Sequence, residues 1–431
     1  MSAFWIAIYF TVVMSPLFAM LIGATPPGRG FWREFSVGLG FVGLSMVGWQ
    51  FFLTGRFKKI TSPYGIDVVY HFHRLVSLLA FSFILIHPVI IIVLTPSPAA
   101  FLNLLEAPWY RTAGVVSFLA FAVVISTSLC RVRFGIGYES WRAIHGYVSV
   151  IAVALSMAHI VGVGYYVQEP LKRWLWISMV AAWILALLYI RILKPFVMFR
   201  RPYIIENVIK ERGNSWTLVL KAEGHKGISY RPGQFAWLTV GKSLSGEHPF
   251  SFSSSAMNPN LIEMTIKALG DFTSKVGEIT PGTRAYIEGP YGTFTIDQHR
   301  SHGYVFIAGG VGITPVISIL KTMRDRIDMR PLILFYGSKN WKDITFYEEI
   351  EDMRKSLNLK IVHILENAPA GWDGETGYIT AELMARHLPE NRIDYQYFVC
   401  GPLPMQIAVK TALDKLGLPM EKVQSESFNF V

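Results

Sequence analysis

The chain has 431 residues, of which 52% are hydrophobic and only 16% charged, with a formal net charge of +10. This composition is too apolar for an ordinary cytosolic enzyme and predicts a chain that lies partly in a membrane. The basic residues form no stripe with interleaved aromatic residues, so the sequence gives no support for binding nucleic acid.

Six apolar stretches in the first 199 residues are near or above the length of a helix that crosses ~30 Å of hydrocarbon. They cover residues 4–22, 35–53, 68–94, 109–129, 143–167 and 174–192. Lys and Arg are more frequent in the loops after the second, fourth and sixth stretches than in the other loops. This bias predicts a multi-pass protein of the cell membrane with both termini and the soluble half in the cytoplasm. The first stretch lacks the features of a cleaved signal peptide, so we expect it to be retained.

Four histidines stand in the third and fifth stretches at equal spacing: His73 and His87, then His145 and His159, each pair fourteen residues apart. In a helix this spacing turns through about 1400°, about 40° short of four turns, and rises ~21 Å, so each pair shares one helix face. Both stretches run in the same direction, so His73 meets His145 near the cytoplasmic side and His87 meets His159 near the outer side. Facing imidazoles at two depths predict two six-coordinate sites that suit the iron of a b-type haem.

Membrane histidines can instead serve only as hydrogen-bonding groups between helices. Four of them in register favour function, because ionisable residues inside a bilayer are costly. His71 is about 160° away from His87 around the helix, so it is expected to be an interfacial polar residue.

Short strands with turn signals, such as YIIENVI, SWTLVLKA and FAWLTV, fill residues 203–297 and are typical of a small antiparallel barrel. The segment HPFSFSSS (residues 248–255) could set hydroxyl donors along the edge of a flat ring. In KALGDFTSKV (residues 267–276), Gly270 closes a turn, and Asp271 or Thr273 can cap a helix beside Lys267, which would form a pyrophosphate seat. An ordinary edge strand and an ordinary capped surface helix are the alternatives.

Strands and helices alternate from Ser301 onward. The segment YVFIAGGVGITPVISILKTM reads as a strand, a glycine turn and a helix whose start can bind phosphate. Two further apolar strands follow, PLILFYGSK and YQYFVC, and the second breaks into Cys400-Gly401-Pro402. A barrel followed by a parallel α/β sheet points to a flavin lobe followed by a nicotinamide lobe.

The series HPFSFSS, GDFT, GGVGITP and CGP resembles the ferredoxin–NADP reductase superfamily. Six spans with paired histidines joined to this module resemble the NADPH oxidase and ferric reductase flavocytochromes over the whole chain, in a compact prokaryote-like form. The resemblance implies a multi-domain membrane protein with three domains. These are a six-helix transmembrane bundle that binds two haems (residues 1–199), an antiparallel β-barrel for FAD (200–298) and an α/β domain for NADPH (299–431).

The resemblance also assigns roles to individual residues. The flavin ring would lie against His248, Pro249, Phe250, Ser251 and Ser253, and the FAD pyrophosphate would meet Lys267, Gly270 and Thr273. The nucleotide pyrophosphate would lie on Gly309, Gly310, Gly312, Thr314 and Pro315, with the nicotinamide beside Cys400, Gly401 and Pro402. Lys339 stands where relatives often carry an arginine for the ribose 2′-phosphate, so NADPH is expected and NADH possible. Ser251, Cys400, Glu426 and Phe428 would act in hydride transfer, Phe428 by stacking on the flavin with Phe430 as its rival.

The expected function is electron transfer from cytosolic NADPH through FAD and two haems to molecular oxygen outside, giving superoxide. Ferric chelate, a quinone or a partner redox protein are alternative acceptors at the same outer haem. No obligatory regulatory subunit is expected, because no regulatory module is visible. The alternative of a non-catalytic receptor or channel with a nucleotide sensor does not account for four histidines in register. It also does not account for the predicted flavin strand, residues 248–255.

Overall fold

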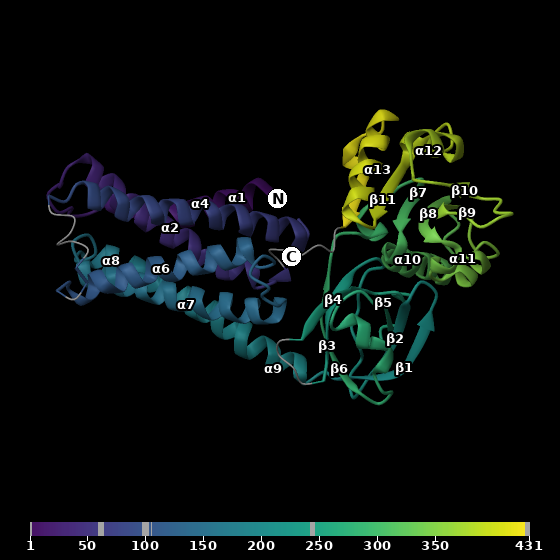
Figure 1. The fold of residues 1–431 in the computed structure, drawn as a ribbon, viewed down its shortest axis with the longest axis horizontal. Helices are drawn as coiled ribbons and strands as arrows, with labels where there is room; N and C mark the ends of the chain where they lie inside the picture. The colour runs from purple at the N-terminus through teal and green to yellow at the C-terminus, as the bar shows by residue number, and fades with distance from the viewer. Residues whose placement is uncertain (1, 59–63, 97–102, 105, 242–245, 427–431) are drawn as a thin grey trace. The chain divides into compact units, whose positions relative to one another are not determined.

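The computed structural model describes residues 2–58, 64–96, 103–104, 106–241 and 246–426. The chain divides into two compact units (Figure 1). The first comprises residues 1–64 and 68–194, and the second residues 65–67 and 195–431.

The first unit is helical. Its helices are α1 (Ser2–Met20), α2 (Phe31–Thr54), α4 (Ile66–Val93), α6 (Trp109–Cys130), α7 (Tyr138–Val163) and α8 (Pro170–Leu188), and α8 continues through a π-helical turn, η1 (Tyr189–Leu193), into α9 (Lys194–Phe199). Five helices of the described chain are long and apolar enough to cross a membrane, namely α2, α4, α6, α7 and α8 with its continuation. The apolar part of α1, Phe4–Met20, is shorter than these. Five of the six predicted spans are therefore present as long apolar helices, and a crossing by α1 stays a prediction.

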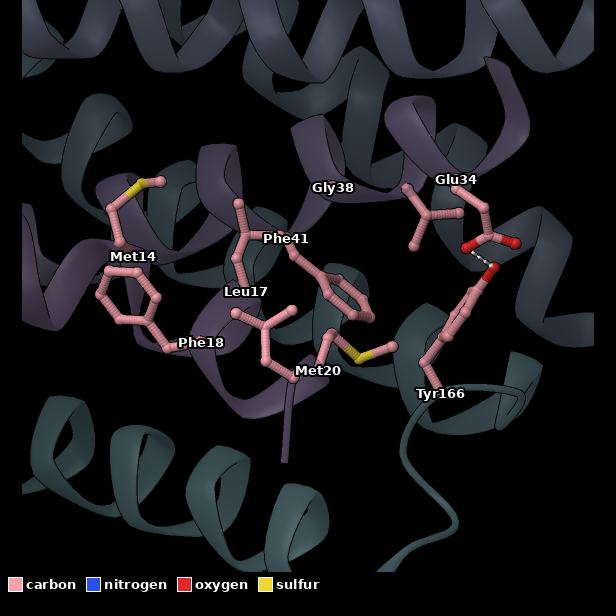
Figure 2. Close-up of a pocket in the computed structure, with 10 residues that line it drawn as sticks. Met14, Leu17, Phe18, Met20, Glu34, Gly38, Phe41 and Tyr166 are labelled. Atoms are coloured by element: carbon pink, nitrogen blue, oxygen red, sulfur yellow. Dashed lines mark hydrogen bonds between the residues drawn. The ribbon is translucent and has the colours of Figure 1, made fainter. Parts of the chain in front are cut away.

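Close contacts between helices depend on small residues. A Cβ at Gly48 of α2 would lie 2.2 Å from the indole ring of Trp183 on α8, so glycine is needed for this approach. Between α6 and α7, the Ser117 hydroxyl donates to the Ala152 carbonyl over 2.7 Å. A hollow of about 390 Å³ opens between α1 and α2, lined by apolar side chains except where Tyr166 donates a hydrogen bond to Glu34 (Figure 2).

The second unit begins with a six-stranded antiparallel sheet. Its strands are β1 (Tyr203–Glu211), β2 (Ser215–Ala222), β3 (Phe235–Val240), β4 (Glu247–Ser251), β5 (Leu261–Lys267) and β6 (Arg284–Tyr291), in the order β4-β3-β6-β1-β2-β5. An isolated bridge between Phe252 and Met264 links the chain just after β4 to β5, at the opposite end of that order. The strands predicted from YIIENVI, SWTLVLKA and FAWLTV are therefore confirmed as β1, β2 and β3.

A parallel sheet follows. It contains β7 (Gly303–Gly309), β8 (Leu332–Asn340), β9 (Leu359–Asn367), β10 (Glu375–Thr376), β11 (Tyr395–Cys400) and β12 (Val423–Glu426), in the order β10-β9-β8-β7-β11-β12. Tyr304 and Phe306 of β7 face the side of α10 (Ile313–Asp325) and α11 (Tyr347–Met353). Val305 and Ile307 face α12 (Ala381–His387) and α13 (Leu403–Lys415), coloured yellow-green to yellow in Figure 1. Both faces are thus covered, which accounts for the continuous apolar runs of these strands.

Candidate functional site

The four histidines lie in two facing pairs contributed by α4 and α7. The ring centres of His73 and His145 are 6.4 Å apart with their planes at 73°, and those of His87 and His159 are 6.4 Å apart at 67°. This is the pairing predicted from the sequence spacing. Two metal–imidazole bonds of about 2.0–2.1 Å, together with the ring radius at each end, account for a separation of this size. His71 is exposed and belongs to neither pair.

Each histidine is held through Nδ1 by a neighbouring helix. On α4, the Nδ1 of His73 lies 2.8 Å from Gln50 Oε1, and that of His87 lies 2.9 Å from both the hydroxyl and the carbonyl of Ser36. Both partners belong to α2.

The α7 histidines are held in the same way by α6. The Nδ1 of His145 lies 3.2 Å from Ser128 Oγ, and that of His159 lies 2.8 Å from the Tyr110 carbonyl. Metal-binding histidines usually engage their second ring nitrogen in this manner, which fixes the ring and the tautomer. In all four rings Nε2 is therefore the nitrogen available to a ligand.

These partners were missed in the sequence, although one signal for them exists. Ser36 and Gln50 on α2 are fourteen residues apart, the same spacing as the two histidines that they hold on α4. Tyr110 acts through its backbone carbonyl, which no sequence pattern marks.

Glycines let the neighbouring helices approach the imidazole rings. A Cβ at Gly114 of α6 would lie 2.7 Å from His159 Nδ1, which is too close for a real contact, and one at Gly40 of α2 would lie 3.3 Å from His87 Cγ. Glycine at position 114 is thus required by the place of the ring.

The pairs fit a metal that brings most of its own ligands. No group of three or more His, Cys, Asp or Glu side chains that could hold a metal ion occurs in the described parts of the chain. Haem iron needs only the two axial ligands from the protein. Beside His73 and His145, Gln50 Nε2 and Trp141 Nε1 are buried donors without a hydrogen-bond partner among the described residues, and the Trp141 ring lies 5.2 Å from that of His145. Such donors suit the carboxylate groups of a macrocycle.

The two predicted flavin motifs come together on the antiparallel sheet. His248 of β4 stacks on Phe272 of the GDFT segment, with ring centres 4.2 Å apart and planes at 16°. Ser251 and Ser253 are buried, whereas Gly270 is exposed. Phe272 was not singled out from the sequence.

The helix start expected beside Lys267 takes another form. The segment η2 (Thr273–Glu278) is a 3-10 helix, and the Thr273 hydroxyl accepts hydrogen bonds from the backbone N–H groups of Leu269 and Gly270, at 3.0 and 2.8 Å. Thr273 therefore closes the loop that precedes it, and Asp271 does not cap an α-helix. A turn with six residues has a weaker dipole than the α-helix that was expected.

The nucleotide motifs meet at the carboxyl edge of the parallel sheet, where β8, β7 and β11 are neighbours. A Cβ at Gly312 would lie 2.3 Å from the Cys400 carbonyl oxygen, and one at Gly309 would lie 2.5 Å from Met405 Sδ. The Thr314 hydroxyl donates to the Val311 carbonyl in the first turn of α10. The glycines thus let the turn after β7 lie directly against the turn after β11, and Lys339, at the end of β8, is exposed at the same edge.

Cys400 and Glu426 are paired in register on β11 and β12, and both are buried. Burial raises the pKa of both groups well above their ordinary values, and for Cys400 the nearby Glu426 carboxyl adds to the effect. A thiol and a protonated carboxyl are therefore the favoured forms.

Two neighbours fix the position of Glu426. Gln406 of α13 donates from Nε2 to the carbonyls of Gly401 and Glu426, at 2.8 and 3.0 Å. Gly292, after β6, leaves room for Glu426, since a Cβ there would lie 2.6 Å from Oε1 and 3.0 Å from the Phe235 ring. Phe235 pairs in register with Ser251 across β3 and β4, so the ring that borders Gly292 stands on the strand next to the predicted flavin strand β4. Phe428 and Phe430 lie outside the described residues.

Comparison with known proteins agrees with this arrangement. Residues 39–156 match the ferric reductase like transmembrane component, residues 207–295 an FAD-binding domain and residues 306–411 an oxidoreductase NAD-binding domain. Among curated proteins, NADH-cytochrome b5 reductase 1 of Aspergillus terreus is 30% identical over 41% of this chain. The matched segment spans 64% of that relative's length, a little under two thirds. The enzyme of the same name from Candida glabrata is 30% identical over 43% of this chain and 69% of its own.

Among solved structures, the FAD/NAD-binding domain of nitric oxide dioxygenase from Vibrio cholerae covers 52% of this chain and 97% of its own, with 20% identity and a TM-score of 0.48. The transmembrane match and the two reductase-domain matches lie one after another along the chain without overlap. The chain therefore joins a ferric reductase like transmembrane domain to FAD-binding and NAD-binding domains, which is the domain architecture of the ferric reductase and NADPH oxidase flavocytochromes.

Proposed function

We propose that this chain is an NADPH oxidase that transfers electrons from NADPH across the membrane to molecular oxygen and releases superoxide, with FAD and two b-type haems as its resident groups. The observation that carries the proposal is the pair of facing imidazoles at two depths, each ring held through Nδ1. When bound, FAD takes up a hydride, and haem iron exchanges one electron at a time, which is the chemistry that these side chains position.

The residues divide between the groups as follows. His73 with His145 would hold the inner haem, and His87 with His159 the outer haem. FAD would lie on β4 and the GDFT loop, against His248, Pro249, Phe250, Ser251, Ser253, Lys267, Gly270 and Thr273. The nucleotide would lie at the carboxyl edge of the parallel sheet, on Gly309, Gly310, Gly312, Thr314, Pro315, Lys339, Cys400, Gly401 and Pro402.

The groups around the nicotinamide site are favoured in their neutral forms. Burial raises the pKa of Cys400 and of Glu426, so the site disfavours the charged forms of both groups. A neutral carboxyl can donate a hydrogen bond, and a neutral site does not hold a positively charged nicotinamide ring after hydride has left it. Phe428 would cover the flavin until the nicotinamide displaces it.

The paired imidazoles bear on the choice of acceptor. His87 and His159 would both ligate the outer haem, so an acceptor would take its electron without binding the metal. Oxygen can accept an electron in this way, and so can a ferric chelate. Ferric reduction is the second candidate, because the matching transmembrane family is described as ferric reductase like.

The proposed topology follows the charge of the loops. We assign six spans, including α1, with the N-terminus and both dehydrogenase domains on the cytoplasmic side of the cell membrane. Arg56, Lys58, Arg131, Arg133 and Arg142 lie in or beside the loops assigned to that side. The three domains are residues 1–199, 200–298 and 299–431, and no regulatory subunit is required for turnover.

The test is NADPH oxidation by the purified chain, loaded with haem and FAD in detergent, followed together with cytochrome c reduction with and without superoxide dismutase. A signal that dismutase abolishes, without added iron, supports the oxidase. If the signal ignores dismutase and turnover rises only with ferric chelate, the acceptor is iron. A correctly folded chain that stays colourless in haem-replete cells would overturn the proposal.

A further inference from the structure

Helix α10 connects the nucleotide turn to the antiparallel sheet. It begins directly after Gly310–Gly312 and carries Ser318, Lys321 and Thr322 at helical spacing on one face, all buried. The Ser318 hydroxyl donates to the Ser254 carbonyl over 2.7 Å, and the Ala256 N–H donates to Thr322 Oγ1 over 2.9 Å. Ser254 and Ala256 lie three and five residues after the end of β4, so one helix reaches from the phosphate turn to the end of the flavin motif HPFSFSSS.

Lys321 is the charged centre of this contact. Only 8% of the residue is exposed, yet its Nζ lies 2.8 Å from Glu263 Oε2 on β5 and 3.1 Å from Glu349 Oε1 on α11. Burial lowers the pKa of Lys321, but the two carboxylates more than offset this, and its pKa is raised overall. Lys321 therefore stays an ammonium group that joins one carboxylate from each sheet's domain.

A chain of hydroxyl groups extends the contact back to the flavin strand. Thr265 donates to Ser253 over 2.9 Å, Thr265 and Thr217 are 2.8 Å apart, and Thr217 donates to Glu211 over 2.8 Å. Burial raises the pKa of Glu211, and the charges of Glu349, Lys321 and Glu263 also act on this pKa. Lys321 thus pairs with one carboxylate on β5 and one on α11, and a third, Glu211 on β1, is close enough to feel their charges.

We propose that Lys321 is a positioning residue: with Ser318 and Thr322 it fixes the nucleotide-binding helix against the flavin strand, so that nicotinamide and flavin meet at the distance hydride transfer needs. This rests on the proposed function, since it assumes that NADPH and FAD occupy the two motifs. Lys321 belongs to neither of the two ligand-binding motifs. Displacing a reacting group by about 1 Å costs up to about a hundredfold in rate, whereas the binding contacts on each side survive.

The experiment measures single-turnover reduction of the flavin by NADPH in the full chain loaded with haem and FAD. Lys321→Met should lower the rate at saturating NADPH between about tenfold and a hundredfold, with FAD content and NADPH affinity changed by less than about twofold. Lys321→Arg keeps the charge and should restore most of the rate. Lys355→Met removes an exposed ion pair with Asp352 on the same domain and should change nothing.

A pH profile separates positioning from general damage. Without Lys321, the carboxylates of Glu211, Glu263 and Glu349 repel one another, and protonating them at lower pH removes the repulsion. Lys321→Met should therefore regain rate as the pH falls, whereas Lys321→Arg should not change in this way. If Lys321→Met fails to retain FAD, Ser318→Ala tests the same contact without leaving the carboxylates of Glu263 and Glu349 unpaired. It should slow hydride transfer severalfold.

The outcomes distinguish the two proposals. If the native chain reduces its flavin with NADPH, and Lys321→Met or Ser318→Ala does so at the native rate, the positioning role is wrong. If the native chain with full FAD is not reduced by NADPH at all, the proposed function itself fails.

Discussion

Replacing Gly114 by alanine should remove one haem and leave the other. The added methyl group would lie 2.7 Å from Nδ1 and 3.0 Å from Cγ of His159, where ordinary contacts begin at 3.4 Å. The ring must retreat by several tenths of an ångström, which breaks its 2.8 Å hydrogen bond to the Tyr110 carbonyl. The backbone of α6 cannot easily move instead, because Ser117 ties it to Ala152 on α7.

The magnitude follows from two terms. Overpacking costs about 1–3 kcal/mol, and the lost hydrogen bond costs about 0.5–1.5 kcal/mol. Together these amount to about 1.5–4.5 kcal/mol, or roughly a 10- to 2000-fold loss of affinity for the haem proposed at His87 and His159. The inner pair, His73 and His145, is not touched by this substitution.

The assay is the haem-to-protein ratio of the purified variant combined with a reductive titration. Gly114→Ala should bind one haem in place of two and titrate in one step. Gly137→Ala is the matched control, because that glycine stands at the start of α7 with φ −59° and a Cβ there would meet nothing within 4 Å. Gly40→Ala, at 3.3 Å from His87, should have a smaller effect. Two haems with unchanged potentials in Gly114→Ala would refute the reasoning.

Three further results are expected. Gln50→Leu removes the Nδ1 partner of His73 and should weaken haem binding at His73 and His145 about 10- to 100-fold. Haem content on dilution measures this, and equal haem retention in the variant and the native chain would contradict it. Lys339→Ala should raise the KM for NADPH about tenfold, by losing a charged contact of about 1.5 kcal/mol or more, and leave the KM for NADH unchanged. Steady-state kinetics with both nucleotides test this, and an equal rise of KM for both would assign Lys339 another role. Glu426→Gln should stabilise the fold relative to the native chain, and the gain should grow as the pH rises above the ordinary glutamate value of 4.5. The reason is that a carboxyl whose pKa is raised in the fold contributes its full stability below the unfolded pKa. That stability is lost as the pH climbs to the folded pKa. Thermal unfolding of both proteins across this range measures the difference, and parallel curves would show that Glu426 carries its charge in the fold.

Periodicity and spacing sufficed to predict the apolar helices, the strands β1, β2, β3, β7, β8 and β11, and the pairing of His73 with His145 and of His87 with His159. These features repeat along the chain with a helix or strand period, so the sequence alone exposes them. The short helix expected after Gly270 was wrong in kind, because the Thr273 hydroxyl bonds to the residues before it rather than to those after it. Local composition does not distinguish these two uses of a threonine.

The supporting residues of the site could not be found in this way. Gln50, Ser128 and the Tyr110 carbonyl meet their histidines only once separate helices pack, and Lys321 resembles any basic residue on an amphipathic helix. Each of these depends on distances between segments that are far apart in the sequence, from 17 residues for Ser128 and His145 to 58 for Lys321 and Glu263. The buried state of Lys321 becomes visible only with both sheets present.

Helix α2 is joined to α4 at two heights, by Gln50 at His73 and by Ser36 at His87, ~21 Å apart along the helices. Sliding or rotating α2 by one residue would break both connections at once, so the two histidine pairs share a single mechanical register. If each pair holds a haem as proposed, occupying one pair fixes that register for the other. Haem loading of the native chain should therefore be cooperative, with half-loaded protein scarce during assembly.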